Sequence, residues 1–269
     1  MGVGAIRCRL LGSPALCRTN KCFAFIQGIS ALQFDQNNFS LAAMRRGPTS
    51  PDIIHLFHSS RPRVVVTYRD HAGRGRIERF IEDTYCGAYG SIITSHYPAI
   101  MSVQDENRAI LGAVGFRDAG FETLFLEQYL SERIEHAVAR RFNEPVARDS
   151  IVEIGNLVSS GKGASAQLFT ALASYLLTSG YRYAAATATT QLRRRFDRMG
   201  FETHELGTAD PAVLADNGAS WGDYYKCGPR VLVGAIPSNL ARLGRYFSDS
   251  RKRATSLAPT ELGADGVLG

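Results

Sequence analysis

The 269-residue chain has few cysteines and no long apolar run, and each shortage excludes a class of protein. Its five cysteines form no CxxC pair and no Cys/His cluster, so the sequence predicts no metal site and is typical of a reducing cytoplasm. No apolar segment approaches the ~18 residues that span a bilayer. A composition of 45% hydrophobic and 21% charged residues excludes a wholly disordered chain, a collagen-like fibre and a coiled coil. We therefore expect a globular, cytoplasmic protein.

The positive charge of the chain is confined to its two ends. Residues 1–60 carry six Lys/Arg against two Asp/Glu, and residues 237–269 carry five against three. Residues 61–236 carry twenty of each sign. A folded nucleic-acid module keeps its positive charge on the folded part, so we predict no nucleic-acid partner. The basic ends leave peripheral contact with anionic lipid as a possible partner interaction.

The texture of the sequence divides the chain into three parts. Residues 1–60 show no sustained period and are expected to be a poorly ordered leader. Residues 61–236 alternate short β-branched runs with helical periodicity and are expected to form one domain. Residues 237–269 read as a poorly ordered basic tail with one short helix candidate around Leu240 and Leu243.

Within the middle part, apolar spacing predicts the following order of elements. Strands are expected at 64–68, 100–103, 110–116, 124–130, 151–158, 181–188 and 201–206, and helices around 77–85, 134–138, 168–176 and 191–199. Residues 100–116 should form a β-hairpin. The succession after residue 151 is strand, small-residue loop, helix, strand, short helix and strand.

The loop Ser159–Ala164 joins a predicted strand to a predicted helix through residues with little or no side chain. Such residues let a ligand approach the backbone, and N–H groups at a helix start bind pyrophosphate or an oxyanion. Lys162 would add a positive charge. The alternative is an ordinary tight turn. Neither the P-loop pattern nor GxGxxG is present.

This order of elements, with Arg198-Met199-Gly200-Phe201 ending the short helix, resembles the core of GNAT-type acyltransferases and acyl-homoserine-lactone synthases. The resemblance implies an α/β (α+β) fold with a GNAT-like mixed central sheet and helices on both faces. It also implies that the loop binds the donor, with Gly161 and Gly163 at the two small positions. Val158 stands where that superfamily has Gln or Arg, which leaves both coenzyme A and an acyl carrier protein open as donor.

Four longer segments resemble the thermostable hemolysin family. They are 125–130 (FLEQYL), 144–148 (EPVAR), 151–157 (IVEIGNL) and 221–231, which holds WGDYY and PRV. The resemblance covers nearly all of residues 75–235. The family name describes lysis of cells and does not specify a reaction.

Three residues are candidates for catalysis. Glu153 lies within an apolar strand, where burial would raise its pKa toward that of a general base; the alternative is an ion pair with Arg117 or Arg148. Glu127 is a second candidate acid, and Tyr129 is a candidate proton donor to a departing thiolate. The donor site would comprise Asn156, Leu157, Val158, Gly161, Lys162, Gly163 and Ala164.

We therefore predict an acyltransferase that moves an acyl group, expected to be fatty, from a thioester to an amine or hydroxyl acceptor. Acyl-CoA or an acyl carrier protein would be the co-substrate, and no permanently bound cofactor or metal is predicted. Two alternatives remain open at this point: a hemolysin that acts directly on bilayers, and a binder that holds acyl ligands without turnover.

Overall fold

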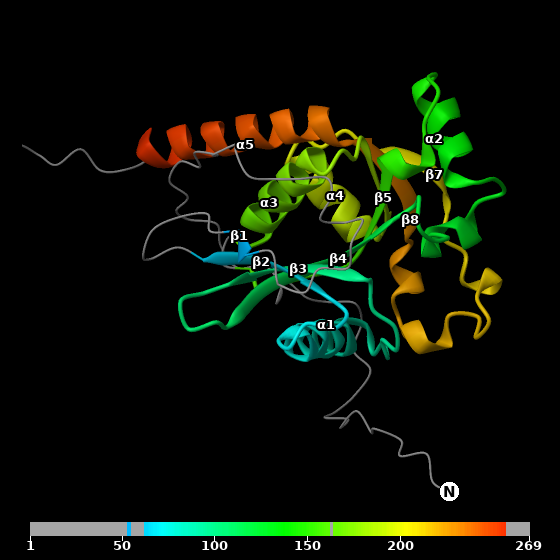
Figure 1. Ribbon diagram of the computed structural model, residues 1–269, viewed down its shortest axis with the longest axis horizontal. Helices are drawn as coiled ribbons and strands as arrows, with labels where there is room; N and C mark the ends of the chain where they lie inside the picture. Colours follow the sequence, from blue (N-terminus) through cyan, green and yellow to red (C-terminus); the bar gives the residue numbers. More distant parts are fainter. Residues whose placement is uncertain (1–52, 55–61, 162–163, 257–269) are drawn as a thin grey trace, which may run out of the picture.

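The computed structural model describes residues 53–54, 62–161 and 164–256, with side chains described within 62–161 and 164–249. Its core is a mixed sheet in the order β1-β2-β3-β4-β5-β6-β8-β7 (Figure 1). The strands are β1 (Ile53–Ile54), β2 (Arg63–Tyr68), β3 (Ala99–Gln104), β4 (Ile110–Asp118), β5 (Ile151–Ser159), β6 (Tyr183–Ala188), β7 (His204–Thr208) and β8 (Arg230–Ala235). Neighbouring strands are antiparallel except β5 and β6, which are parallel.

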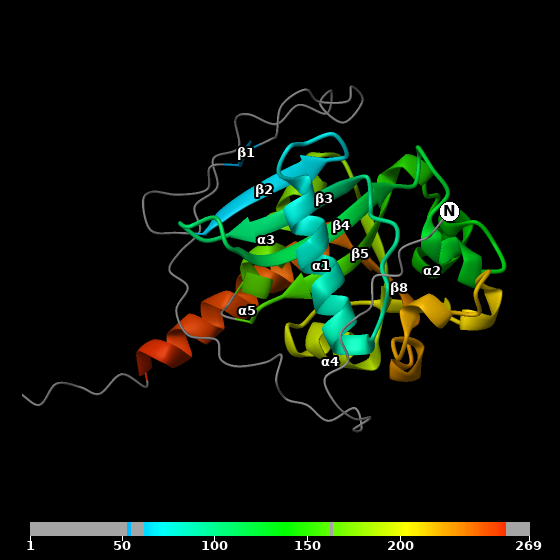
Figure 2. The same cartoon turned by 90° about the horizontal axis from the view of Figure 1, so that it is seen from below.

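Helices cover both faces of this sheet. They are α1 (Arg74–Tyr89), α2 (Ile134–Phe142), α3 (Ala164–Thr178), α4 (Thr190–Arg198) and α5 (Ile236–Ser256). In Figure 1, α3, α4 and α5 lie above the sheet and α1 lies below it. Figure 2, seen from below, shows α1 crossing the middle strands. The mixed α/β sheet with helices on both faces, expected from the sequence, is therefore confirmed.

Apolar spacing places the helices against the sheet. Ile77, Ile81 and Tyr85 recur every four residues along α1 and pack with Val158 of β5. Gly90 ends α1 in the left-handed conformation (φ 69°), and its N–H donates to the Cys86 carbonyl at 2.8 Å. On the other face, α3 places a similar stripe against the middle strands. Its members are Leu168, Leu172 and Leu176.

Three predicted segments differ from the structure. Residues 125–129, expected to be extended, form a 3-10 helix, η2 (Phe125–Tyr129), because Glu153 and Glu127 accept hydrogen bonds from its backbone. The segment from residue 237, expected to be a poorly ordered tail, is helix α5 as far as Ser256, and its Leu243 is fully buried. Ile53–Ile54, placed in the expected leader, pair with β2. The rest of the leader (1–52 and 55–60) and residues 257–269 lie outside the described residues.

Candidate active site

The two parallel strands at the middle of the sheet separate partway along their length. Their ladder runs from Ile151↔Tyr183 to Ile154↔Ala186, whereas β5 continues to Ser159 and β6 to Ala188. Beyond Ile154 the facing edges of β5 and β6 no longer bond to each other. The backbones of β5 and β6 therefore part near Asn156, and the edges that face each other there make no hydrogen bonds across the gap.

A β-bulge at Asn156 turns β5 away from β6. Asn156 has a left-handed φ of 50°. Gly115 pairs with Gly155 and Ala113 with Val158, so two residues of β5, Asn156 and Leu157, lie opposite one residue of β4. A bulge of this kind bends its strand and re-aims the side chains beyond it. It explains why Val158 packs toward α1, on the face that Gly155 also addresses.

Two buried polar atoms flank the opening without partners. The side-chain nitrogen Nδ2 of Asn156, a residue only 6% exposed, makes no hydrogen bond within the described part of the chain. The hydroxyl of Thr187, the first residue of β6 past the ladder, is also buried and unbonded there. Buried polar groups in folded proteins are nearly always paired, because each orphan costs about 1–3 kcal/mol. These two atoms therefore point to a ligand that supplies their partners.

Both oxygens of Glu153 are already occupied by groups of the protein. Oε2 accepts from the Phe125 N–H at 2.8 Å, and Oε1 accepts from the Leu126 N–H and the Tyr97 hydroxyl, each at 3.1 Å. The guanidinium of Arg117 lies 3.5 Å away, which is the ion pair that the sequence left open as an alternative. Glu153 is 1% exposed, and burial raises its pKa, although Arg117, the two N–H groups and Tyr97 act in the opposite direction.

Glu127, in the middle of η2, belongs to a separate ion-pair network. Its carboxylate binds the Arg148 guanidinium through two hydrogen bonds of 2.7 Å and also accepts from the backbone N–H groups of Leu124 and Ile134. Burial raises the pKa of Glu127, but these hydrogen bonds outweigh it and hold the pKa at about 2. The structure therefore does not bring Glu127 to Glu153; each carboxylate fixes a different part of η2.

Tyr129 belongs to a group of aromatic rings on the α1 face of the sheet. Its hydroxyl lies 2.5 Å from that of Tyr225. Tyr224, next along the chain, donates from its hydroxyl to the Thr187 carbonyl at 3.1 Å. Tyr225, which pairs with Tyr129, therefore directly follows a residue that is hydrogen-bonded to β6. Burial, followed by the hydrogen bond with Tyr225, raises the pKa of Tyr129, so this phenol holds its proton at neutral pH.

Both ends of the predicted donor loop are described. Gly161 has a left-handed φ of 89°, and Ala164 begins α3, where its N–H donates to the Gly161 carbonyl at 2.9 Å. Leu157 and Val158 precede the loop and pack toward opposite faces of the sheet. Lys162 and Gly163 lie outside the described residues.

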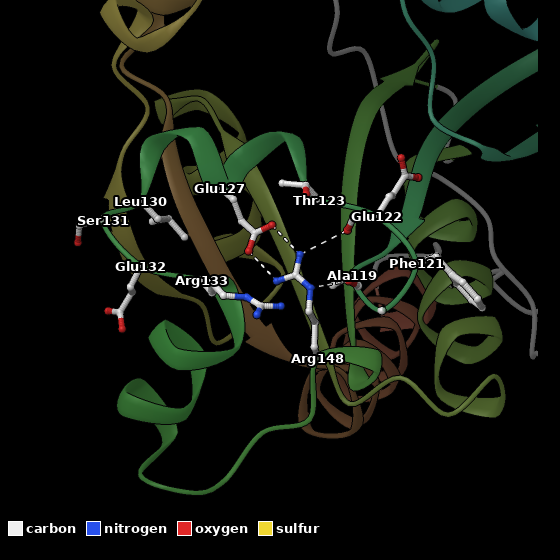
Figure 3. A pocket seen from close by; sticks show the side chains of 11 residues that line it. Ala119, Phe121, Glu122, Thr123, Glu127, Leu130, Ser131, Glu132, Arg133 and Arg148 are labelled. Carbon is white, nitrogen blue, oxygen red and sulfur yellow. Dashed lines mark hydrogen bonds and ion pairs between the residues drawn. The ribbon is translucent and has the colours of Figure 1, made fainter.

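A depression of about 660 Å³ lies away from the parted strands, between the β4–η2 loop and the start of α2 (Figure 3). The Arg148–Glu127 pair forms part of its lining. All five donors of Arg148 are engaged, by Glu127, Glu135 and two backbone carbonyls. The polar groups at its floor therefore hold the fold together.

The sequence did not single out Thr187 or Tyr97 as site residues. Thr187 lies within the alanine-rich strand β6, and nothing in the neighbouring sequence shows that β5 turns away there. The sequence signal for Tyr97 is indirect: Gly115 and Gly155 lack the side chains that would clash with its ring. Within the described ranges, no three His, Cys, Asp or Glu side chains gather as metal ligands, and no helix is long and apolar enough to cross a membrane.

The fold and this site define an α/β domain whose mixed central sheet opens between two parallel strands. The family model of thermostable hemolysins matches residues 67–240, so the chain belongs to the thermostable hemolysin family. No curated protein sequence matches the chain.

The chain is also similar to several solved structures. One is TofI in a ternary complex with an inhibitor and MTA (14% identity, 67% of this chain and 96% of that chain, TM-score 0.48). A second is the AHL synthase LasI (14% identity, 66% and 91%, TM-score 0.46). A third is FeeM, an N-acyl amino acid synthase from uncultured soil microbes (14% identity, 66% and 93%, TM-score 0.46).

Proposed function

We propose that this thermostable hemolysin is an acyltransferase, which takes an acyl group, fatty in our hypothesis, from an acyl-CoA or acyl-carrier-protein thioester. The acceptor is an amine or a hydroxyl. The observation that carries the proposal is the parting of β5 and β6 with Asn156 Nδ2 and Thr187 Oγ1 buried and unpaired beside it. An extended thioester arm with its own amide groups fits between two such edges, because it supplies the partners that a ladder strand would supply.

The far end of the donor arm would lie at the loop that follows β5. Small residues at Gly161 and Ala164 leave the backbone open to approach, and α3 begins there with its positive dipole end. Lys162 and Gly163 complete the proposed donor site. Coenzyme A and a carrier protein share this phosphate-bearing arm, and both are cytoplasmic, so we place the reaction in the cytoplasm.

The proton is handled by the tyrosine pair in this proposal. The acceptor nitrogen or oxygen forms a bond to the carbonyl carbon, and the carbon–sulfur bond breaks with its electron pair leaving on sulfur. Tyr129 gives its proton to that thiolate, and the proton lost by the acceptor returns to the tyrosine. The raised pKa keeps this phenol protonated at neutral pH, and because a thiol is the stronger acid, proton transfer to sulfur is coupled to the return of the acceptor's proton to the tyrosine.

Glu153 has a positioning role in the same proposal. Its hydrogen bonds with the Phe125 and Leu126 N–H groups join η2 to β5, and η2 carries Tyr129. Three of the four lone-pair sites of this carboxylate already accept hydrogen bonds, and the Arg117 cation lies 3.5 Å from Oε2, so we assign the proton transfer to another group. Glu127, in the middle of η2, ties this helix to Arg148.

The test measures thiol release from decanoyl-CoA and from decanoyl carrier protein, with and without a panel of amines and alcohols. Acceptor-dependent release supports the proposal. Dye leakage from liposomes is measured in parallel without any donor, and leakage with no thiol release would support direct action on membranes and refute the enzyme.

Variants link the activity to the opening. Asn156→Gly keeps the left-handed backbone while removing the carboxamide, and Thr187→Val replaces the hydroxyl by a methyl group of similar size. We expect each variant to raise the donor KM about tenfold, the loss of one buried hydrogen bond. Ser174→Ala is the matched control, because Ser174 Oγ is also buried and unpaired but lies in α3. Equal effects from all three variants would contradict the proposed donor site.

A further inference from the structure

Arg117 lies beside the opening. Its side chain is mostly buried, yet its guanidinium makes no hydrogen bond to the described residues that would explain why the fold buries it. This residue lies on β4 directly opposite Glu153, with its guanidinium carbon 4.5 Å from the centre of the Tyr97 ring. Only 15% of its side chain is exposed. The register pair Gly115↔Gly155, the last before the bulge, lies two residues further along.

No hydrogen bond leaves the Arg117 guanidinium within the described part of the chain. Its Nε is buried without a hydrogen-bond partner. Its two ion pairs, Nε to Glu153 and Nη1 to Glu122, both measure 3.5 Å, which exceeds the 2.7–2.9 Å of a charge-assisted hydrogen bond. A guanidinium has five N–H donors, and none of them makes a hydrogen bond to the residues that the structure describes; the two ion pairs and the Tyr97 ring hold the Arg117 cation.

Two other arginines with similarly buried side chains make short hydrogen bonds to groups of the protein. Arg148, 18% exposed, makes hydrogen bonds of 2.6–2.7 Å to Ala119, Glu127 and Glu135. Arg74, 5% exposed, bonds to Glu78 at 2.7 Å and to the carbonyl of Pro98 at 2.9 Å. Of these three arginines, Arg117 alone makes no hydrogen bond within the described ranges; the Nε atoms of Arg63 and Arg193 are also buried without a hydrogen-bond partner there.

The surroundings of Arg117 select the kind of anion that it would bind. A planar fork of N–H donors matches a carboxylate through two parallel hydrogen bonds. Glu153 and Glu122 already bring negative charge to the same place, which disfavours a doubly charged phosphate. Glu122 is 38% exposed, so its side chain has solvent to move into when a ligand carboxylate replaces it.

We propose that Arg117 binds the carboxylate of the acyl acceptor, which is therefore an amino acid or a similarly small molecule with an amine near its carboxylate. This inference rests on the proposed function, which leaves the acceptor open. Two residues of strand span ~7 Å. An amine held by its carboxylate at Arg117 can thus reach a thioester at the parted strands beyond Gly155.

The reaction balances without another reactant. The amino nitrogen forms a bond to the carbonyl carbon, and the thioester carbon–sulfur bond breaks. The proton lost from nitrogen ends on the released thiol by way of the tyrosine pair. The products are an N-acyl amino acid and the free thiol of the carrier.

The first measurement is binding without any donor. Calorimetric titration compares a panel of L-amino acids with the corresponding L-amino acid amides, which keep the amine and lose the carboxylate charge. We expect at least one acid to bind about tenfold or more tightly than its amide, and Arg117→Gln to remove that preference. Equal binding of acid and amide, or binding of neither, overturns the inference.

The second measurement uses two substitutions whose effects should have opposite signs. Arg117→Gln should raise the KM for the amino acid about tenfold or more, while Glu122→Gln should lower it by removing the competing carboxylate. A purely structural Arg117–Glu122 ion pair predicts the same sign for both. Arg140→Gln is the control, because Arg140 is 72% exposed and pairs with Glu132 on the surface of α2.

Failure of this inference is distinguishable from failure of the proposed function. If simple amines accept the acyl group as well as amino acids do, and Arg117→Gln slows both equally, the enzyme stands and the carboxylate site falls. If amino acids bind in an Arg117-dependent manner and no acceptor releases thiol, the carboxylate site stands and the acyltransferase falls.

Discussion

The hydroxyl of Tyr97 reaches Glu153 by lying across two glycines. Tyr97 donates to Glu153 Oε1 at 3.1 Å, and its ring covers Gly115 and Gly155, which pair with each other between β4 and β5. A methyl group at Gly115 would lie 2.7 Å from the ring, and one at Gly155 would overlap the hydroxyl itself. The contact between Tyr97 and Glu153 therefore requires glycine at both of these paired positions.

Gly155→Ala should destabilise the protein by about 1–3 kcal/mol, because the added methyl group pushes Tyr97 away from Glu153. Urea unfolding monitored by circular dichroism measures this change. Gly87→Ala is the control, since a methyl group at Gly87 in α1 would meet nothing within 4 Å. That substitution should leave stability unchanged or raise it by up to about 1 kcal/mol, the helix preference of alanine over glycine. Equal stability of Gly155→Ala and wild type would contradict the packing described for Tyr97.

The Glu127–Arg148 pair should control stability in acid. The folded protein holds the pKa of Glu127 at about 2, below the ordinary value of 4.5. A lowered folded-state pKa gives stability that is present above pH 4.5 and is lost as the pH falls toward 2. Glu127→Gln should therefore be less stable than wild type by about 2–3 kcal/mol at pH 7, and the two should converge near pH 2. Thermal unfolding at pH steps between 2 and 7 tests this, and parallel curves with a constant gap would contradict it.

The sequence predicted most of the fold because that information is local. The hairpin of residues 100–116 appears as β3 and β4, and the stretch after Ile151 forms β5, α3, β6, α4 and β7 in the expected order. Apolar periodicity and the glycines at element ends predict the bounds of these elements to within a few residues of those observed. Residues 125–129 were placed wrongly as extended, because their 3-10 helix depends on Glu153, more than twenty positions away.

The site was less accessible from the sequence for the same reason. Glu153 and Gly155, two positions apart on β5, share a face of the sheet as strand alternation requires, and Tyr97 contacts both. The bulge at Asn156 then shifts the alternation by one residue, and no pattern within β5 announces it. The engagement of Glu153 with Arg117 and of Glu127 with Arg148 depends on how three distant segments meet, so the sequence left these pairings open.

Glu153→Gln separates a positioning carboxylate from a general base. The glutamine amide brings N–H donors toward the donors of Phe125, Leu126 and Tyr97, so we expect a stability loss of about 1–3 kcal/mol. The kcat should fall because η2, which carries Tyr129, is no longer held in place. The pH profile of the remaining activity should keep its shape. A variant that keeps wild-type stability yet loses about 10²–10⁴ in kcat would instead identify Glu153 as the base.

Tyr129 and Tyr225 should act as one unit in turnover, because their hydroxyls lie 2.5 Å apart. Tyr129→Phe and Tyr225→Phe should each slow the chemical step, and the double variant should be no slower than the worse single variant. Single-turnover thiol release measures that step apart from product release. Tyr85→Phe provides the control, since Tyr85 belongs to the same aromatic group, 6.4 Å from the Tyr224 ring, and lies on α1. If the two single effects multiply in the double variant, the hydroxyls act independently. The proton would then reach the thiolate by another route, and the tyrosine pair would serve only to join η2 to the β7–β8 loop.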